Sequence, residues 1–125
     1  VVMSVYNGEK FVAETIESVL NQTYSNIEVI IVDDCSKDGS RQIIEKYQKK
    51  DRRVRTILMD RNSNVCVACN RAFANATGKY VAVIGHDDIW GADKIDILGR
   101  TSRCRYMFYL DRSAWGEWSA DQQGI

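Results

Sequence analysis

The apolar residues of this chain follow two alternating patterns over its first 90 positions. Short runs rich in β-branched residues predict buried strands at residues 1–5, 28–32, 54–59 and 80–84. Between these runs, apolar residues recur at helical spacing, first from Val12 to Leu20. Strands that alternate with helices are typical of a parallel sheet with right-handed crossovers. We therefore expect an α/β, Rossmann-like fold with a mainly parallel sheet and flanking helices.

Two further helices are expected after the second and third predicted strands. Ser40 is predicted to cap the first of them, which would turn Ile44 and Tyr47 inward together with Ile43. The other would begin in the loop 62–64 and end at Gly78. Its apolar stripe comprises Val65, Ala68, Ala72, Phe73 and Ala76.

The pattern weakens after Leu98. Residues 106–110 favour one more strand, but the rest of the segment 99–125 has no clear period. We therefore expect residues 1–98 to form the α/β portion. Residues 99–125 are expected to be either non-native or the start of a further region, so that the fold would be truncated or incomplete at its C-terminal side.

Composition and charge narrow the classes of partner. Lysine plus arginine and aspartate plus glutamate number 17 each, whereas an electrostatic nucleic-acid-binding protein should be clearly basic. Apolar residues make up 45% of the chain, which indicates a packed core, yet no apolar run is long enough to span a bilayer. Four cysteines are too few for a disulfide scaffold. We therefore expect no nucleic-acid partner, no transmembrane segment in this chain, and a cytoplasmic location, either free or peripheral at the inner face of the membrane.

Polar clusters follow three of the predicted strands. They are Ser4 to Asn7, Asp33-Asp34, and His86-Asp87-Asp88. For any single acidic pair, turn chemistry at a strand end is the stronger interpretation. Ligands of an open parallel sheet bind at the carboxyl ends of its strands, however, and all three clusters are expected at that edge. Their convergence favours a binding site.

Acidic residues at a strand end can serve a nucleoside diphosphate in two ways. One carboxylate can accept hydrogen bonds from a base or a ribose hydroxyl, and another can hold a divalent cation such as Mg²⁺, which takes its other ligands from phosphates and water. The sequence contains no G-x-G-x-x-G and no Walker A motif. The diphosphate charge would therefore be met mainly by a metal ion.

Several motifs in order resemble family 2 glycosyltransferases, which have the GT-A fold. Residues 4–11 (SVYNGEKF) resemble the opening of that family, and residues 16–24 (IESVLNQTY) its first helix. Residues 31–40 (IVDDCSKDGS) resemble its V-D-D-x-S-x-D-G-[ST] signature, and Asp87-Asp88-Ile89-Trp90 resembles the segment that carries its D-x-D motif. The resemblance covers residues 1–98. It implies an inverting enzyme of polysaccharide biosynthesis that makes a cell-wall or surface glycan.

The resemblance also implies roles for individual residues. Ser4, Tyr6 and Asn7 would line the nucleotide pocket. Asp34 would receive the base, and Asp33 would support the loop or the ribose. Asp87 would hold Mg²⁺ or Mn²⁺, with Asp88 beside it. The donor would be a UDP- or dTDP-sugar and the acceptor a hydroxyl of a glycan or lipid-linked molecule.

The sequence departs from the family pattern at several places. The first Asp of D-x-D is Gly85, the usual proline before the V-Y-N turn is Ser4, and Asn64 and Cys69 replace a glycine and an arginine in the third helix region. The general base of the family lies in the acceptor half, and no motif selects among the tail carboxylates Asp111, Glu117 and Asp121. The catalytic base is thus unidentified, and we expect the chain as given to transfer no sugar efficiently.

Two smaller questions stay open at this point. His86 could be a metal ligand, a substrate contact or a solvated loop residue. Cys66 and Cys69 form a C-x-x-C that could be a redox pair or half a zinc site, although packing on the helix face is the preferred interpretation.

Two alternatives to an active transferase also remain. A signalling receiver domain has a similar fold and an acidic Mg²⁺ site, but its acidic pair follows the first strand, whereas Asp33-Asp34 follows the second. A receiver also needs a late lysine, and no lysine follows Lys94. The other alternative is an inactive nucleotide-binding remnant, which would differ in activity rather than in its site.

Overall fold

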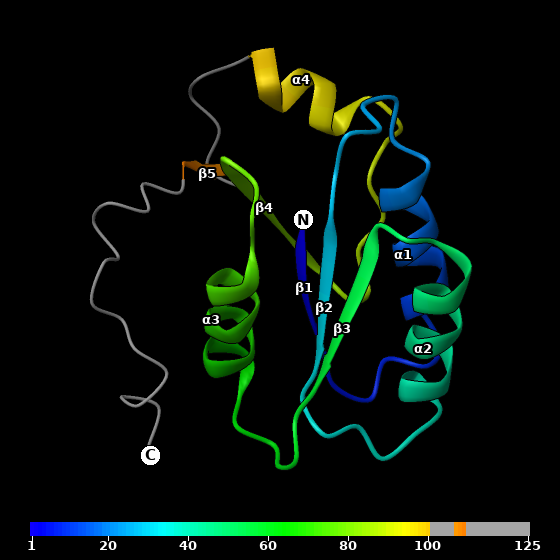
Figure 1. Cartoon of the computed structure of the whole chain (residues 1–125). Helices are drawn as coiled ribbons and strands as arrows, with labels where there is room; N and C mark the ends of the chain where they lie inside the picture. The colour runs from blue at the N-terminus through cyan, green and yellow to red at the C-terminus, as the bar shows by residue number, and fades with distance from the viewer. Residues whose placement is uncertain (101–106, 110–125) are drawn as a thin grey trace.

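The structure is a computed structural model that describes residues 1–100 and 107–109 (Figure 1). Strands and helices alternate along it, as the apolar pattern predicts. In chain order the elements are β1 (Val2–Val5), α1 (Val12–Leu20), β2 (Val29–Asp33), α2 (Ser40–Lys50), β3 (Val54–Leu58), α3 (Val65–Asn75), β4 (Tyr80–Gly85), α4 (Lys94–Arg100) and β5 (Met107–Tyr109).

The strands form one sheet in the order β3-β2-β1-β4-β5. Strands β1 to β4 are parallel, with Ser4 paired to Val32 on one side and to Gly85 on the other, and β5 runs antiparallel to β4. The expected mainly parallel α/β sheet is therefore confirmed. Because β1 lies between β2 and β4, the carboxyl ends of these three strands are adjacent.

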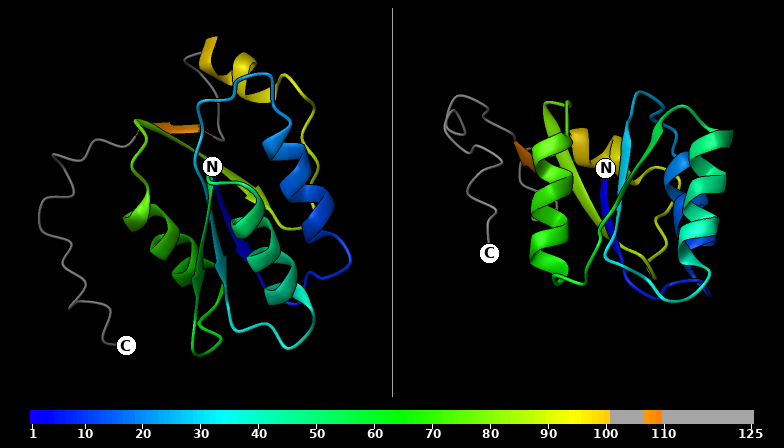
Figure 2. Two further views of the ribbon diagram at one scale, coloured as in Figure 1. Left: turned by 45° about the vertical axis from the view of Figure 1, so that its right-hand side comes forward. Right: turned by 60° about the horizontal axis from the view of Figure 1, so that its bottom comes forward.

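Helices cover both faces of the sheet. Helices α1 and α2 lie on one face and α3 on the other, as Figures 1 and 2 show. Alternate strand residues serve the two cores: Met3 and Ile31 pack toward α1 and α2, whereas Val2 and Ile30 pack toward α3. Each of these side chains is at most 1% exposed. Full burial of such a side chain contributes about 1.5–3 kcal/mol, so the paired cores fix the register of the strands that carry the site.

Details of two helix boundaries differ from the sequence-based expectation. The prediction that Ser40 caps α2 is wrong, since Gly39 occupies the N-cap position and no side chain caps it. The Ser40 hydroxyl instead accepts a hydrogen bond from Gly8 N at 2.9 Å and donates to Asp38 Oδ1 at 2.6 Å. Helix α3 ends at Asn75 rather than at Gly78. Its first residue, Val65, is 61% exposed and does not belong to the inward stripe.

Helix α4 was not anticipated from the sequence. It is only seven residues long, and its buried residues are Ile95 and Leu98, which is too short a repeat to reveal a helical period. It extends past residue 98 and lies near the end of the sheet where β2 begins (Figure 1). Within the described residues, no helix is long and apolar enough to cross a bilayer.

Candidate functional site

The carboxyl ends of β1, β2 and β4 surround a hollow of about 340 Å³. Four of the residues expected from the sequence line it: Ser4, Tyr6, Asp34 and His86. They come from three different strand ends, which the sheet order brings together. This position, outside the carboxyl edge of a parallel sheet, is where ligands of such folds bind.

Asp34 lines this hollow and is buried, at 3% exposed. Its Oδ1 accepts hydrogen bonds from Ser63 N at 2.9 Å and Ser63 Oγ at 3.0 Å, and its Oδ2 accepts one from Asn64 N at 3.0 Å. A carboxylate oxygen can accept two hydrogen bonds, so Oδ2 retains one acceptor position. Asp34 thus holds the β3–α3 loop and can still receive one donor.

The β3–α3 loop supplies residues that sequence reasoning did not place at the site. Asn62, Asn64 and Val65 also line the hollow. Asn64 has φ 85° and ψ 163°, a conformation that is essentially restricted to glycine, and its side chain accepts hydrogen bonds from Cys66 N and Val67 N at the start of α3. One signal in the sequence could have indicated this conformation. The family pattern has glycine at this position, and glycine adopts such a backbone conformation without strain.

His86 lies against the turn that follows β1. A Cβ atom placed on Gly8 would lie only 2.5 Å from the imidazole Cδ2, so a glycine is needed there for His86 to keep its place. The main-chain oxygen of His86 accepts a hydrogen bond from Thr15 Oγ1 at 2.9 Å. These contacts hold the half-buried imidazole at the hollow.

Asn7 does not line the hollow. Its main-chain N–H donates to Ser36 Oγ at 3.0 Å, and its side-chain oxygen accepts from Lys37 N at 2.8 Å. It has φ 49°, a left-handed conformation that asparagine tolerates better than most residues. Asn7 thereby fastens the β1–α1 loop to the β2–α2 loop.

Asp38 strengthens the same connection between the two loops. Its carboxylate accepts hydrogen bonds from Ser40 N at 3.0 Å, Ser40 Oγ at 2.6 Å and Glu9 N at 3.1 Å. Burial by itself would raise the pKa of Asp38, but these hydrogen bonds outweigh it and hold the pKa below its ordinary value. The Asp38 carboxylate that joins the two loops is therefore charged at neutral pH.

Asp33 is fully buried and lies outside the hollow. Its Oδ2 accepts from Arg41 Nε at 2.6 Å and from Ser36 N at 3.2 Å, while Oδ1 has no hydrogen-bond partner among the described residues. The Arg41 guanidinium also donates to Met59 O at 2.6 Å, and its hydrogen bond to Asp33 raises the pKa of Arg41. Asp33 therefore supports the β2–α2 loop and ties it to the end of β3.

Asp87 and Asp88 follow β4 and are exposed. They do not line the hollow, but both carboxylates approach Gly85: a Cβ atom there would lie 2.7 Å from Asp88 Oδ2 and 3.3 Å from Asp87 Oδ1. Two hard oxygen donors therefore converge where the family pattern has its first aspartate. No group of three or more His, Cys, Asp or Glu side chains able to hold an ion occurs in the described part of the chain. The pair nonetheless fits Mg²⁺ or Mn²⁺, which takes only one or two protein carboxylates when phosphates and water complete its shell.

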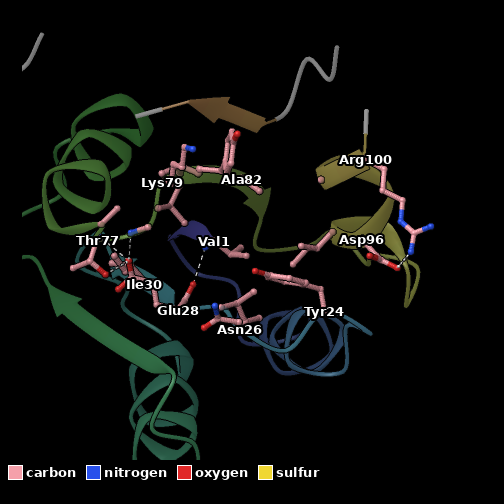
Figure 3. Close-up of a pocket in the computed structure, with 18 residues that line it drawn as sticks. Val1, Tyr24, Asn26, Glu28, Ile30, Thr77, Lys79, Ala82, Asp96 and Arg100 are labelled. Atoms are coloured by element: carbon pink, nitrogen blue, oxygen red, sulfur yellow. Dashed lines mark hydrogen bonds and ion pairs between the residues drawn. The ribbon is translucent and has the colours of Figure 1, made fainter. Parts of the chain in front are cut away.

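A larger hollow of about 690 Å³ lies at the opposite, amino-terminal edge of the sheet. Figure 3 shows Tyr24, Glu28, Thr77 and Arg100 around it. Glu28 accepts hydrogen bonds there from Thr77 Oγ1 at 2.8 Å and Gly78 N at 3.0 Å. Burial acts to raise the pKa of Glu28, but the hydrogen bonds led by Thr77 lower it overall. The carboxylate thus joins the starts of β2 and β4 and has a structural explanation.

None of the cysteines among the described residues lines the hollow at the carboxyl edge of the sheet. Cys35, Cys66 and Cys69 are free thiols. Cys66 is exposed, so the interpretation that it packs on the helix face is wrong for this residue, and Cys69 is half-buried. Asp111, Glu117 and Asp121, the carboxylates from which a general base could not be chosen, lie outside the described residues.

The family is shown by comparison with known sequences. The profile described as "Glycosyl transferase family 2" matches residues 1–98, and the chain belongs to this family. The putative teichuronic acid biosynthesis glycosyltransferase TuaG of Bacillus subtilis is 42% identical over 96 residues, which cover 77% of this chain and 38% of that protein. Glycosyltransferase GlyG of Streptococcus pneumoniae is 37% identical over 98 residues, which cover 78% of this chain and 33% of that protein.

Solved structures agree with this assignment. The crystal structure of S. aureus TarS residues 1–349 in complex with UDP matches with a TM-score of 0.73 and 29% identity, covering 79% of this chain and 30% of that chain. The fold is thus that of GT-A glycosyltransferases, and the receiver-domain alternative is superseded. The chain spans about a third of the length of the relatives named here.

Proposed function

We propose that this chain carries the donor-binding portion of an inverting glycosyltransferase. It would bind a nucleoside-diphosphate sugar, with the UDP or dTDP moiety at the carboxyl edge of the sheet, and its sugar would pass to a hydroxyl of a glycan or lipid-linked acceptor. The observation that carries the proposal is the convergence of Ser4, Tyr6, Asp34 and His86 around one hollow. The presence of UDP in the related TarS structure supports a uridine nucleotide.

Asp34 is the proposed contact for the base. Its Oδ2 keeps one acceptor position, which suits an imide N–H of uracil or thymine. Tyr6 lines the same hollow and is 44% exposed, and we propose that the base stacks on its ring. Asn7 and Asp33 would act indirectly, by holding the loops that shape the hollow.

The diphosphate is proposed to lie toward Asp87 and Asp88, with His86 between them and the nucleoside. Asp87 and Asp88 would hold Mg²⁺ or Mn²⁺, which as a Lewis acid would stabilise the charge of the departing diphosphate. The imidazole of His86 would donate a hydrogen bond to a phosphate oxygen. Neither role requires a glycine-rich phosphate loop, which the sequence lacks.

Our proposal for the acceptor side of the reaction rests on membership of the family. Inversion in one displacement needs a carboxylate that takes the proton of the acceptor hydroxyl as it attacks the anomeric carbon. Similarity to TuaG supports a cell-wall or surface glycan as the product. We propose that the protein acts in the cytoplasm, either free or at the inner face of the membrane.

Calorimetric titration with UDP, with and without Mn²⁺, tests the donor site. We expect UDP binding that depends on the metal in the wild type and much less in Asp87→Asn. Asp93→Asn is the matched control, because Asp93 is an exposed carboxylate further along the same segment and lines neither hollow. Metal-independent UDP binding by the wild type would contradict the metal assignment, and no UDP binding under either condition would contradict the donor site itself.

A further inference from the structure

One face of helix α1 binds the segment that carries the acidic pair. Thr15 and Ser18 are three residues apart and share a face of α1, and Gln22 lies just after the helix, which ends at Leu20. Each forms a hydrogen bond with the main chain of residues 86–95. Figure 1 shows this segment running alongside α1 after it leaves β4.

The hydrogen bonds enclose the acidic pair on both sides. Before it, Thr15 Oγ1 donates to His86 O at 2.9 Å. After it, Ser18 Oγ accepts from Trp90 N at 3.2 Å. The three residues between these anchors, 87–89, are exposed. Within this stretch Asp88 N donates to Gly85 O at 3.2 Å and Gly85 N donates to Asp88 Oδ2 at 3.3 Å. The acidic pair therefore sits on a short turn that is fixed at both ends to the same helix.

The neighbours of the Thr15 and Ser18 hydroxyl groups fix which hydrogen bonds each hydroxyl donates and accepts. Thr15 is fully buried, and its hydroxyl proton points to a carbonyl oxygen. The Ser18 hydroxyl donates to Thr15 O at 2.8 Å, which leaves its lone pairs for the N–H of Trp90. Neither contact can be replaced by an apolar side chain without leaving a main-chain group unpaired.

Gln22 completes this set of contacts, and only one orientation of its side-chain amide satisfies all of its hydrogen-bond partners. Its Nε2 donates to Gly91 O at 2.6 Å and to Ser18 O at 3.0 Å, while its Oε1 accepts from Ile95 N at 3.0 Å. The residue is 6% exposed. A carboxylate of the same shape would place an acceptor against two carbonyl oxygens, so the glutamine is specific at this position.

We infer that Thr15, Ser18 and Gln22 are positioning residues for the divalent metal held by Asp87 and Asp88, and that α1 sets where those two carboxylates stand. The inference rests on the proposed metal site. Groups that bond directly to metal-binding side chains typically alter metal affinity by about 10–100-fold when they are removed. Thr15, Ser18 and Gln22 act through the main chain on either side of the two carboxylates, so their effect should lie at the low end of this range. The helix would thus contribute to metal binding without touching the ion.

The test measures Mn²⁺ affinity in the presence of UDP, from the electron paramagnetic resonance signal of free Mn²⁺. Thr15→Val and Gln22→Glu remove donors at nearly constant shape, and Ser18→Ala is a milder variant at a half-buried position. We expect Thr15→Val and Gln22→Glu to weaken Mn²⁺ binding by about 10-fold, and Ser18→Ala by less. Thr15→Ser, which keeps the hydroxyl, should stay close to the wild type. Glu14→Gln, on the exposed side of α1, is the matched control and should change nothing.

Circular dichroism identifies which variants are folded, and Ser18→Ala keeps the inference testable if the buried substitutions do not fold. Folded Ser18→Ala and Gln22→Glu proteins that bind Mn²⁺ as tightly as the wild type would overturn the positioning role and leave the proposed donor site intact. Absence of Mn²⁺ binding by the wild type would overturn the metal site and this inference together. Equal loss of affinity in Thr15→Ser and Thr15→Val would also contradict it, because the hydroxyl would then be irrelevant.

Discussion

The carboxylate of Asp34 accepts two hydrogen bonds from Ser63, one from its main-chain N–H at 2.9 Å and one from its hydroxyl at 3.0 Å. Through this contact the end of β2 fixes the β3–α3 loop, although the two residues are 29 positions apart in the sequence. Residues of this loop line the hollow together with Asp34. A single buried carboxylate therefore both shapes the candidate nucleotide site and faces it.

Replacing Asp34 by alanine should have two effects. Loss of a buried charged hydrogen-bond partner should lower the free energy of unfolding by about 1–3 kcal/mol, because Ser63 and Asn64 lose their acceptor. UDP binding should weaken by a similar amount if the base contacts this carboxylate. Urea unfolding and calorimetry measure the two effects separately. Asp60→Asn, at an exposed strand-end carboxylate, is the control, and an Asp34→Ala protein with wild-type UDP affinity would contradict the assignment of the base.

Asn64 offers a test of backbone strain at the same loop. Asn64→Gly should remove strain of about 1–3 kcal/mol while losing only a few tenths as a cap, so the free energy of unfolding should rise. Asn64→Ala keeps the strain and removes the cap, and should be destabilising by about 1 kcal/mol. Chemical denaturation of both variants gives the comparison. A glycine variant no more stable than the alanine variant would contradict the strained conformation.

Adding a side chain at position 85 should change the affinity for the metal ion rather than the stability of the fold. In Gly85→Ala the new methyl group would meet the ends of the Asp87 and Asp88 side chains, which can move aside at little cost in stability. Displacing them should weaken Mn²⁺ binding, which calorimetry in the presence of UDP detects. Gly99→Ala is the matched control, since nothing lies within 4 Å of its added Cβ. Unchanged Mn²⁺ affinity in Gly85→Ala would show that the convergence of the two carboxylates is irrelevant to binding.

The lowered pKa of Asp38 predicts that part of the protein's stability is lost in acid. Its pKa is lower in the folded state than its ordinary value, so its contribution to stability is present above about pH 4 and is lost as the pH falls through the lower folded pKa. Asp38→Asn cannot titrate. It should be less stable than the wild type at neutral pH and should lose less stability on acidification. Urea unfolding at about pH 6 and about pH 3 measures this difference, and equal losses in both proteins would contradict it.

The sheet was predictable because its signal is local. Each of the first four strands is a short β-branched run, and β1 alternates Val2 and Met3 between two cores that the intervening helices supply. Alternation of strands with helices then restricts the topology to a few parallel arrangements. The position of Asp34 and His86 at one edge follows from that topology alone.

Other features depend on contacts between distant residues and have no local pattern. Ser40 resembles a helix cap, but its hydroxyl is engaged by Gly8, 32 residues earlier. Asn7 resembles a pocket residue, but it binds the loop at Lys37. The contacts that α1 and Gln22 make with residues 86–95 are equally hidden. From the sequence Gln22 is an ordinary polar residue near a helix end, and only the fold places Gly91 and Ile95 against it.

The most direct test of the account is where UDP binds on this chain, since the two hollows lie at opposite edges of the sheet. Backbone amide resonances recorded during titration with UDP, using diamagnetic Mg²⁺, would locate the nucleotide. We predict shifts concentrated at Tyr6, Asp34 and His86, with Thr77 and Tyr80 unaffected. Shifts centred on Thr77 and Tyr80, or none at either edge, would contradict the assignment of the donor site.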